Sequence, residues 1–227
     1  MPRAPTVALL LAALTPLGCG EGGTDPGGDT DILAMASASG DGQSAPFGTV
    51  LGNPLRVILT RDGSPVPGRS VAWQAQHGVQ LNPVSATTGA DGIASTVVTL
   101  PPFGSTRTIT ASVLGAVGSP QVFTVTATGA GTAVTVQVVN TEFLPSTFNL
   151  KAGGVVTYTW AAGSGPHNVT PVAPNLIPAS ADPPPPGTHT GPYSFDVTFP
   201  TAGTFKIFCS VHGSADTGMH GVITVVP

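Results

Sequence analysis

Three features of the sequence predict an all-β fold made of two β-sandwich domains. Runs of alternating apolar and polar residues recur along the chain, for example at residues 93–98 and 108–113, and a period of two is typical of strands with one buried face. Asp-Gly turn signals, such as residues 91–92, separate these runs. The 227 residues approach the upper limit for one domain, and the composition shifts at residues 129–131, which indicates a domain boundary there.

The first 45 residues are expected to be a leader and a linker. An apolar run at residues 7–14 is too short to span a bilayer but fits the centre of a secretory signal. The run ends near Cys19 in a segment that resembles a bacterial lipoprotein signal, so residues 1–19 are predicted to be a signal peptide with lipidation at Cys19. Residues 20–45 begin with glycines and acidic residues and are predicted to be a flexible linker. A free secreted protein with an incidental cysteine is the alternative.

The cysteine content points to a special role for one thiol. The chain has two cysteines, Cys19 and Cys209, and therefore no internal disulfide framework. If Cys19 carries a lipid, Cys209 is an unpaired thiol in an oxidising compartment. Metal ligation would keep such a sulfur as a protected thiolate.

The first predicted domain, residues 46–130, shows no chemistry. It resembles the bacterial immunoglobulin-like domains of the invasin and intimin type, through Asp-Gly-x-Pro-Val-Pro-Gly-x-x-Val-x-Trp at residues 62–73 and Thr-x-x-Asp-Gly-x-Ala at residues 88–94. This resemblance implies a spacer or an adhesive module. Trp73 is expected in the core of the sandwich, and His77 has no second ligand or nucleophile near it in the sequence.

The second predicted domain, residues 132–227, contains metal-ligating residue types near its end. Cys209 continues the core face of its strand, which places the sulfur at the apolar end of a sandwich. His212 and Met219 follow it, and His167 lies upstream. One thiolate, two imidazoles and a weak axial thioether are the donor set of a trigonal electron-transfer copper site.

The domain carries an ordered set of motifs: Phe143-x-Pro145, Lys151-x-Gly153, His167-Asn168-Val169, Gly203-Thr204-Phe205, Cys209-x-x-His212 and Gly218-Met219-x-Gly221. Through these motifs it resembles the cupredoxins, the blue copper proteins, and most closely their plastocyanin-like branch. The resemblance implies a Greek-key sandwich with one mononuclear type 1 copper centre and the metal ligands His167, Cys209, His212 and Met219. Six residues separate His212 from Met219, more than in the plastocyanin pattern, so the longer loop bears most on the axial ligand.

Neighbours of these ligands are expected to support the ligand side chains. Asn168 and Ser210 are placed to tie the two ligand loops together by a side-chain hydrogen bond. Val211 stands where the plastocyanin-like pattern commonly has a proline, so its N–H is available to the Cys209 thiolate. His189, in a proline-rich loop, is expected either at the surface or near the copper edge.

The functional expectation is one-electron transfer by an exported protein. There is no His-x-His pair among the five histidines, so further copper centres and catalysis by this chain alone are not expected. The sparse, net acidic charge of −4 gives no support for nucleic-acid binding. We expect the protein to exchange electrons with redox partner proteins. We also expect it to lie in the periplasm or at the cell surface, attached to a membrane through a lipid. The alternatives are a surface adhesion or structural protein, and a copper storage or delivery protein.

Overall fold

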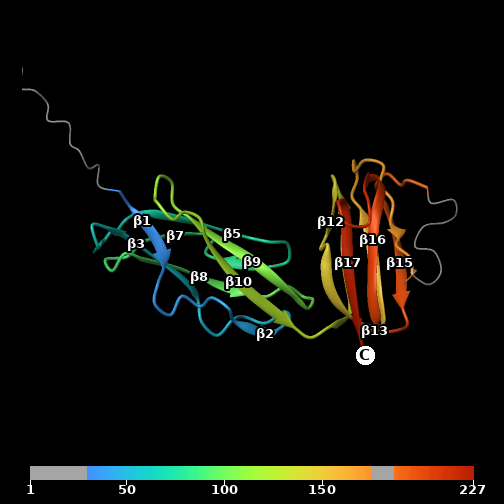
Figure 1. The fold of residues 1–227 in the computed structure, drawn as a ribbon, viewed down its shortest axis with the longest axis horizontal. Helices are drawn as coiled ribbons and strands as arrows, with labels where there is room; N and C mark the ends of the chain where they lie inside the picture. The colour runs from blue at the N-terminus through green and yellow to red at the C-terminus, as the bar shows by residue number, and fades with distance from the viewer. Residues whose placement is uncertain (1–29, 175–186) are drawn as a thin grey trace, which may run out of the picture.

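The computed structural model describes residues 30–174 and 187–227, and all the regular structure in these ranges is β-strand (Figure 1). The prediction of an all-β protein is therefore confirmed. The predicted signal peptide and Cys19 lie outside the described residues. Within the described ranges, no helix has the length and apolar character needed to cross a membrane.

The first sandwich is built from two sheets. One has the strand order β1-β3-β8-β6 with β4 beside β3, and the other has the order β2-β10-β9-β5-β7. The strands are β1 (Ile32–Met35), β2 (Ser44–Pro46), β3 (Leu55–Arg61), β4 (Ser64–Pro65), β5 (Ser70–Ala75), β6 (Gln80–Asn82), β7 (Ser85–Thr87), β8 (Ile93–Thr99), β9 (Ser105–Ser112) and β10 (Gln121–Thr128).

Alternation along these strands produces the core between the sheets. Leu55, Val57 and Leu59 of β3 are fully buried, and the residues between them are more exposed. Trp73 is buried as expected and lies against Phe123, with ring centroids 5.7 Å apart. The sequence period of two therefore gives the inner face of each sheet.

The predicted linker at residues 20–45 is too long at its C-terminal end. Residues 32–35 form β1, which pairs antiparallel with β3, and the Leu33 side chain is buried. The Asp31 carboxylate forms ion pairs with Arg61 at 2.8 Å and with Arg69 at 3.0 Å. These partners lie far along the chain, so a glycine- and aspartate-rich composition did not reveal that this segment is an edge strand of the first sandwich.

The second sandwich is one sheet that folds over on itself. Its order is β12-β11-β13-β17-β16-β14, with β15 also paired to β13. The first part of β13 pairs with β17 and its later part pairs with β11 and β15, so this strand serves both layers. The strands are β11 (Gly131–Val139), β12 (Glu142–Leu144), β13 (Thr147–Trp160), β14 (Thr170–Pro171), β15 (Tyr193–Phe199), β16 (Gly203–Gly213) and β17 (Gly218–Val226).

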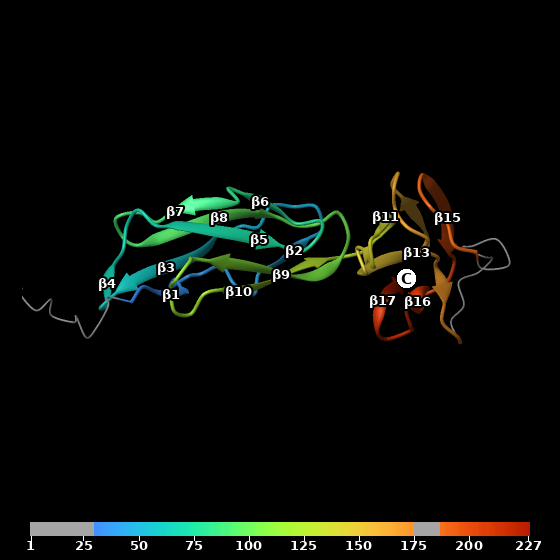
Figure 2. The ribbon, with the colours of Figure 1, turned by 90° about the horizontal axis from the view of Figure 1, so that it is seen from above.

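The two sandwiches meet at a contact that we call the joint, formed by residues 103–107 of the first domain and residues 147–149 of the second. Phe103 is buried in the core of the second sandwich, where its ring lies 6.2 Å from that of Phe148. Two independent domains would have separate cores, but Phe103 of the first domain is part of the core of the second. Figures 1 and 2 show the β9 end of the first sandwich against the flank of the second.

Polar contacts reinforce the joint. The Arg107 guanidinium lies 5.0 Å from the centre of the Phe103 ring and donates a hydrogen bond to the Thr147 carbonyl at 3.0 Å. The Asn149 N–H donates to the Gly104 carbonyl at 2.7 Å. Burial lowers the pKa of Arg107, and the π-face and carbonyl stabilise the cation there.

Candidate metal centre

Three of the four predicted ligands meet at one end of the second sandwich. The Cys209 Sγ lies 3.9 Å from His167 Nδ1 and 3.6 Å from His212 Nδ1, and the donor atoms of the three residues all lie within 4.8 Å of one another. Cys209 and His167 are buried, at 0% and 1% exposure, and His212 is partly exposed. One thiol and two imidazoles therefore converge at the edge of the core, with one imidazole reaching the surface.

The strand pattern explains the position of Cys209. Phe205, Ile207 and Cys209 alternate with more exposed residues along β16 and point into the core, as the sequence predicted. His167 comes from the loop between β13 and β14, where its neighbours Asn168 and Val169 are also buried. The two segments adjoin because β14 pairs with β16.

Met219 is buried in the core of the second sandwich, in the same cluster of buried side chains as Cys209. It is 1% exposed, and it shares the inner face of β17 with Ile223 and Val225. The long spacing after His212 is taken up by a hairpin in which Gly213 pairs with Gly218. Both glycines are required there, because a Cβ on either would lie 2.5 Å from backbone atoms of the facing strand. The extra residues thus extend the hairpin and leave Met219 facing inward.

The ligand hairpin is also closed by polar contacts. The Ser214 N–H donates to the Thr217 carbonyl at 2.8 Å, and the two hydroxyl groups lie 2.8 Å apart. Asp216 forms an ion pair with Lys206 on β16, whose ammonium group donates a hydrogen bond to the carboxylate. The hydrogen bond and the positive charge of Lys206 lower the pKa of Asp216. The turn between the two ligand strands therefore has a defined shape.

The arrangement of donors fits a copper ion. A nitrogen at about 2.1 Å and a sulfur at about 2.3 Å from one divalent first-row ion, separated by about 120°, lie about 3.8 Å apart. The two measured separations between the Cys209 sulfur and the imidazole nitrogens fall on either side of this value. A soft thiolate with two imidazoles and a nearby thioether favours copper in an electron-transfer site over a closed zinc site.

Burial also prepares His167 for metal binding. Burial lowers its pKa, and the neighbouring His212 lowers it further. The two rings are 4.6 Å apart. Because neutral imidazole is the form that binds metal, this environment favours the ligating state of His167.

Asn168 and Ser210 join the two ligand segments. The Asn168 Nδ2–H donates to Ser210 Oγ at 2.8 Å, and the Ser210 N–H donates back to Asn168 Oδ1 at 2.8 Å. The side-chain hydrogen bond expected from the sequence is present, and the second bond adds the backbone to it. This reciprocal pair links the residue after His167 to the residue after Cys209.

The hydrogen bond expected from Val211 is not formed. Among the described residues, the polar contacts of the Cys209 sulfur are with the two imidazoles, and the Val211 N–H does not donate to it. The pairing of β16 with β17 shifts register between Phe208 and Gly213, and Val211 is 48% exposed. The sequence does not reveal this irregularity.

The other two histidines of the second domain lie in different surroundings. His220 points away from Met219 and donates its Nδ1–H to the Gly218 carbonyl at 2.8 Å. His189 lies at the edge of the metal centre, the second of its two expected places, because its backbone pairs with that of His167. No pattern in the sequence indicates that His189 pairs with His167.

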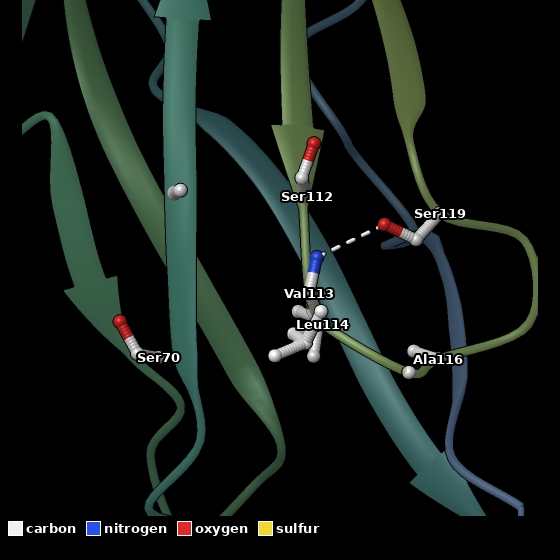
Figure 3. Close-up of a pocket in the computed structure, with 8 residues that line it drawn as sticks. Ser70, Ser112, Val113, Leu114, Ala116 and Ser119 are labelled. Carbon is white, nitrogen blue, oxygen red and sulfur yellow. Dashed lines mark hydrogen bonds between the residues drawn. The ribbon is translucent and has the colours of Figure 1, made fainter.

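The first sandwich offers pockets without comparable chemistry. One, of about 580 Å³, is lined by small hydroxyl and apolar side chains, including Ser70, Ser112 and Leu114 (Figure 3). Figure 3 shows the Ser119 hydroxyl accepting a hydrogen bond from the Val113 N–H, at 3.0 Å. No charged or metal-ligating side chain lines this pocket.

These features define the second sandwich as a cupredoxin-type domain with one type 1 copper centre. Residues 130–226 match the family of copper binding proteins described as the plastocyanin/azurin family. The match covers the second sandwich and leaves the first sandwich outside it. No curated protein matches the chain.

Solved structures of copper proteins are also similar to part of the chain. Amicyanin from Paracoccus versutus (Thiobacillus versutus) is 23% identical, over 41% of this chain and 81% of amicyanin, with a TM-score of 0.32. Reduced auracyanin from the photosynthetic bacterium Roseiflexus castenholzii is 21% identical, over 44% of this chain and 100% of auracyanin, with a TM-score of 0.35. A reduced mutant of amicyanin is 27% identical, over 43% and 86% of the two chains, with a TM-score of 0.34.

Proposed function

We propose that the C-terminal domain is a carrier of single electrons rather than an enzyme, with a copper ion held by His167, Cys209, His212 and Met219. The observation that carries this proposal is the buried Cys209 sulfur with imidazole nitrogens at 3.9 and 3.6 Å. When bound, copper supplies the Cu(II)/Cu(I) couple. Sulfur donors favour Cu(I) and imidazoles accept both states, so this donor set suits repeated one-electron exchange.

The buried and the exposed ligands have different proposed roles at this site. The buried His167 and Cys209 keep water from the metal position, and the packed strand that carries Cys209 keeps the sulfur in place. His212 is partly exposed, so it is the proposed route by which an electron enters or leaves. Redox partner proteins would dock around this histidine.

We further propose that the protein is exported and held at a membrane by a lipid on Cys19. The first sandwich, whose sequence resembles bacterial immunoglobulin-like domains, would act as a spacer between the membrane and the copper domain. Fractionation tests this: the wild-type protein should partition with membranes and Cys19→Ser should be released. Equal partitioning of the two proteins would contradict lipidation.

A spectroscopic titration tests the copper proposal. Cu(II) added to the reduced, metal-free full-length protein should produce an intense visible band from thiolate-to-copper charge transfer, at one copper per chain. A folded, reduced sample without this band would refute the proposal. Repeated oxidation and reduction in the presence of a copper chelator then distinguishes functions, because a carrier keeps its metal whereas a storage or delivery protein releases it.

A further inference from the structure

The backbone of His167 is held by a residue distant in sequence. The His167 N–H donates to the His189 carbonyl at 3.1 Å, and the His189 N–H donates to the His167 carbonyl at 2.8 Å. These two bonds form an isolated antiparallel bridge outside the named strands. The main chain at His167 therefore depends on how firmly His189 is held.

Aromatic rings fasten His189 to the ends of two strands. Its imidazole stacks on the Tyr193 ring with centroids 3.8 Å apart and an angle of 7° between the planes. Trp160, buried at the end of β13, meets both rings edge-on, at 5.8 Å from His189 and 5.4 Å from Tyr193. Trp160 also pairs with Tyr193, the first residue of β15, so the stack is anchored in the sheet.

A close backbone approach supports the same arrangement. A Cβ at Gly191 would lie 1.6 Å from the Ala161 carbonyl oxygen, so only glycine fits between the two segments. That carbonyl accepts hydrogen bonds from both the N–H and the hydroxyl of Ser164, at 3.1 and 2.6 Å. The loop that leads to His167 thus contacts the His189 segment near its start, at Ala161, as well as at His167.

We propose that His189 and Tyr193 are positioning residues for His167, whose stacked rings hold the bridge that sets this ligand before metal binds. The proposal rests on the proposed function in that His167 is taken as a copper ligand. A ligand with a fixed main chain moves little when the metal changes oxidation state, and such support around a ligand tunes the metal it binds.

Hydrogen exchange of the metal-free, full-length protein tests the proposal directly. In Tyr193→Ala and His189→Ala, the His167 amide should exchange about tenfold faster or more than in the wild type. The Val222 amide, which donates to the Ser146 carbonyl in the same domain, should keep its protection. Tyr193→Phe preserves the stacked ring and should preserve the protection of His167.

The copper-loaded variants give a second readout. Tyr193→Ala should change the ratio of the visible bands and the electron paramagnetic resonance spectrum, because the His167 bond to copper is altered, and Tyr193→Phe should not. Unchanged exchange at His167 in both alanine variants would overturn the proposal. So would an equal loss of protection at Val222, since that would indicate a loss of stability throughout the domain. A wild-type protein without the blue band would refute the proposed function and leave the exchange result to be judged separately.

Discussion

The second sandwich has two regions that are held together differently. One is the joint, and the other is the end that carries His167, Cys209 and His212, which we call the metal end. At the metal end, donor atoms from separate segments converge and are held by directional hydrogen bonds, as in the Asn168–Ser210 pair. At the joint, a phenyl ring inserted from the first sandwich fills a gap in the core. Asn149 at the joint shares its register position with Thr224 of β17, which is about 17 Å along the strand from Met219.

Because of this separation, we expect copper binding at the metal end to be independent of the contact with the first sandwich at the joint. The strands are long enough to insulate one region from the other, because packing changes are felt most by direct neighbours. Variants at the metal end should therefore change spectra and potentials with little effect on attachment. Variants at the joint should change stability with little effect on the spectrum.

The largest expected effect follows from removing the thiol. Cys209→Ala should abolish the visible band of the copper-loaded protein entirely, because no other thiol in the second domain can donate charge to the metal. Absorption spectroscopy after copper addition measures this. Cys209→Ser keeps the size and should behave in the same way, and a surviving blue band in either variant would show that Cys209 is not the sulfur ligand.

Removing the phenyl ring at the joint should have the next largest effect. Phe103→Ala should lower the free energy of unfolding by about 3 kcal/mol, since it takes a large buried side chain out of the second core. The blue band should stay in place because the donors lie elsewhere. Denaturant unfolding and absorption spectra measure the two effects.

Two controls sharpen the test of the joint. Leu114→Ala, at a side chain that is 94% exposed, should change neither stability nor spectrum. Deletion of the first domain up to residue 130 should destabilise the copper domain through the loss of Phe103 and Arg107 while keeping the band. An altered spectrum in that deletion would mean that the joint reaches the metal end.

Replacing the thioether should have a smaller effect. Met219→Leu should keep the blue colour and raise the reduction potential. Although the donor is a sulfur atom, an additional axial bond stabilises Cu(II) more than Cu(I), and the substitution removes this bond. A tenfold change in the relative affinity for the two oxidation states corresponds to about 59 mV in a one-electron couple. Voltammetry of the two proteins measures the shift, and identical potentials and spectra would show that Met219 is not axial.

The smallest expected effect is a pH dependence at the joint. His77 lines an open pocket between the two domains. Partial burial of its ring lowers its pKa and the Arg107 charge lowers it further, against an opposing effect of Glu142. A lowered pKa means that the unfolded chain binds a proton more readily, so stability should fall as the pH drops below about 6.5. The effect is small because His77 is exposed and solvent screens its charge interactions.

Denaturant unfolding at pH 7, 6 and 5 measures this dependence. His77→Gln should flatten the pH profile over that range relative to the wild type. A profile with the same slope in both proteins would assign the pH dependence to other groups.

The parts of the molecule that follow from local patterns could be predicted from the sequence. The alternation of apolar residues gives the strands and the inward direction of Cys209, and the order of donor types gives a copper site. The side-chain hydrogen bond between Asn168 and Ser210 was also accessible, because each residue adjoins a ligand.

The features that were missed depend on long-range contacts. Leu33 and Asp31 look like linker residues until β3 and the arginines are brought beside them. The ring of His189 stacks on that of Tyr193, and Gly191, between them in the sequence, lies close against the Ala161 carbonyl. No pattern in the sequence indicates this arrangement. The Val211 N–H, which does not bond to the Cys209 sulfur, lies where the pairing of β16 with β17 shifts register, and only the paired strands define that shift.

The joint also governs how the protein tumbles in solution. Linked domains move independently when their interface is small and polar, but here only Gly129 and Ala130 lie between β10 and β11, and Phe103 is buried across the boundary. The two sandwiches should rotate as a single elongated particle with a shared, anisotropic correlation time. Nuclear spin relaxation would then report slower reorientation for the amides of the copper domain than a free domain of its size would have.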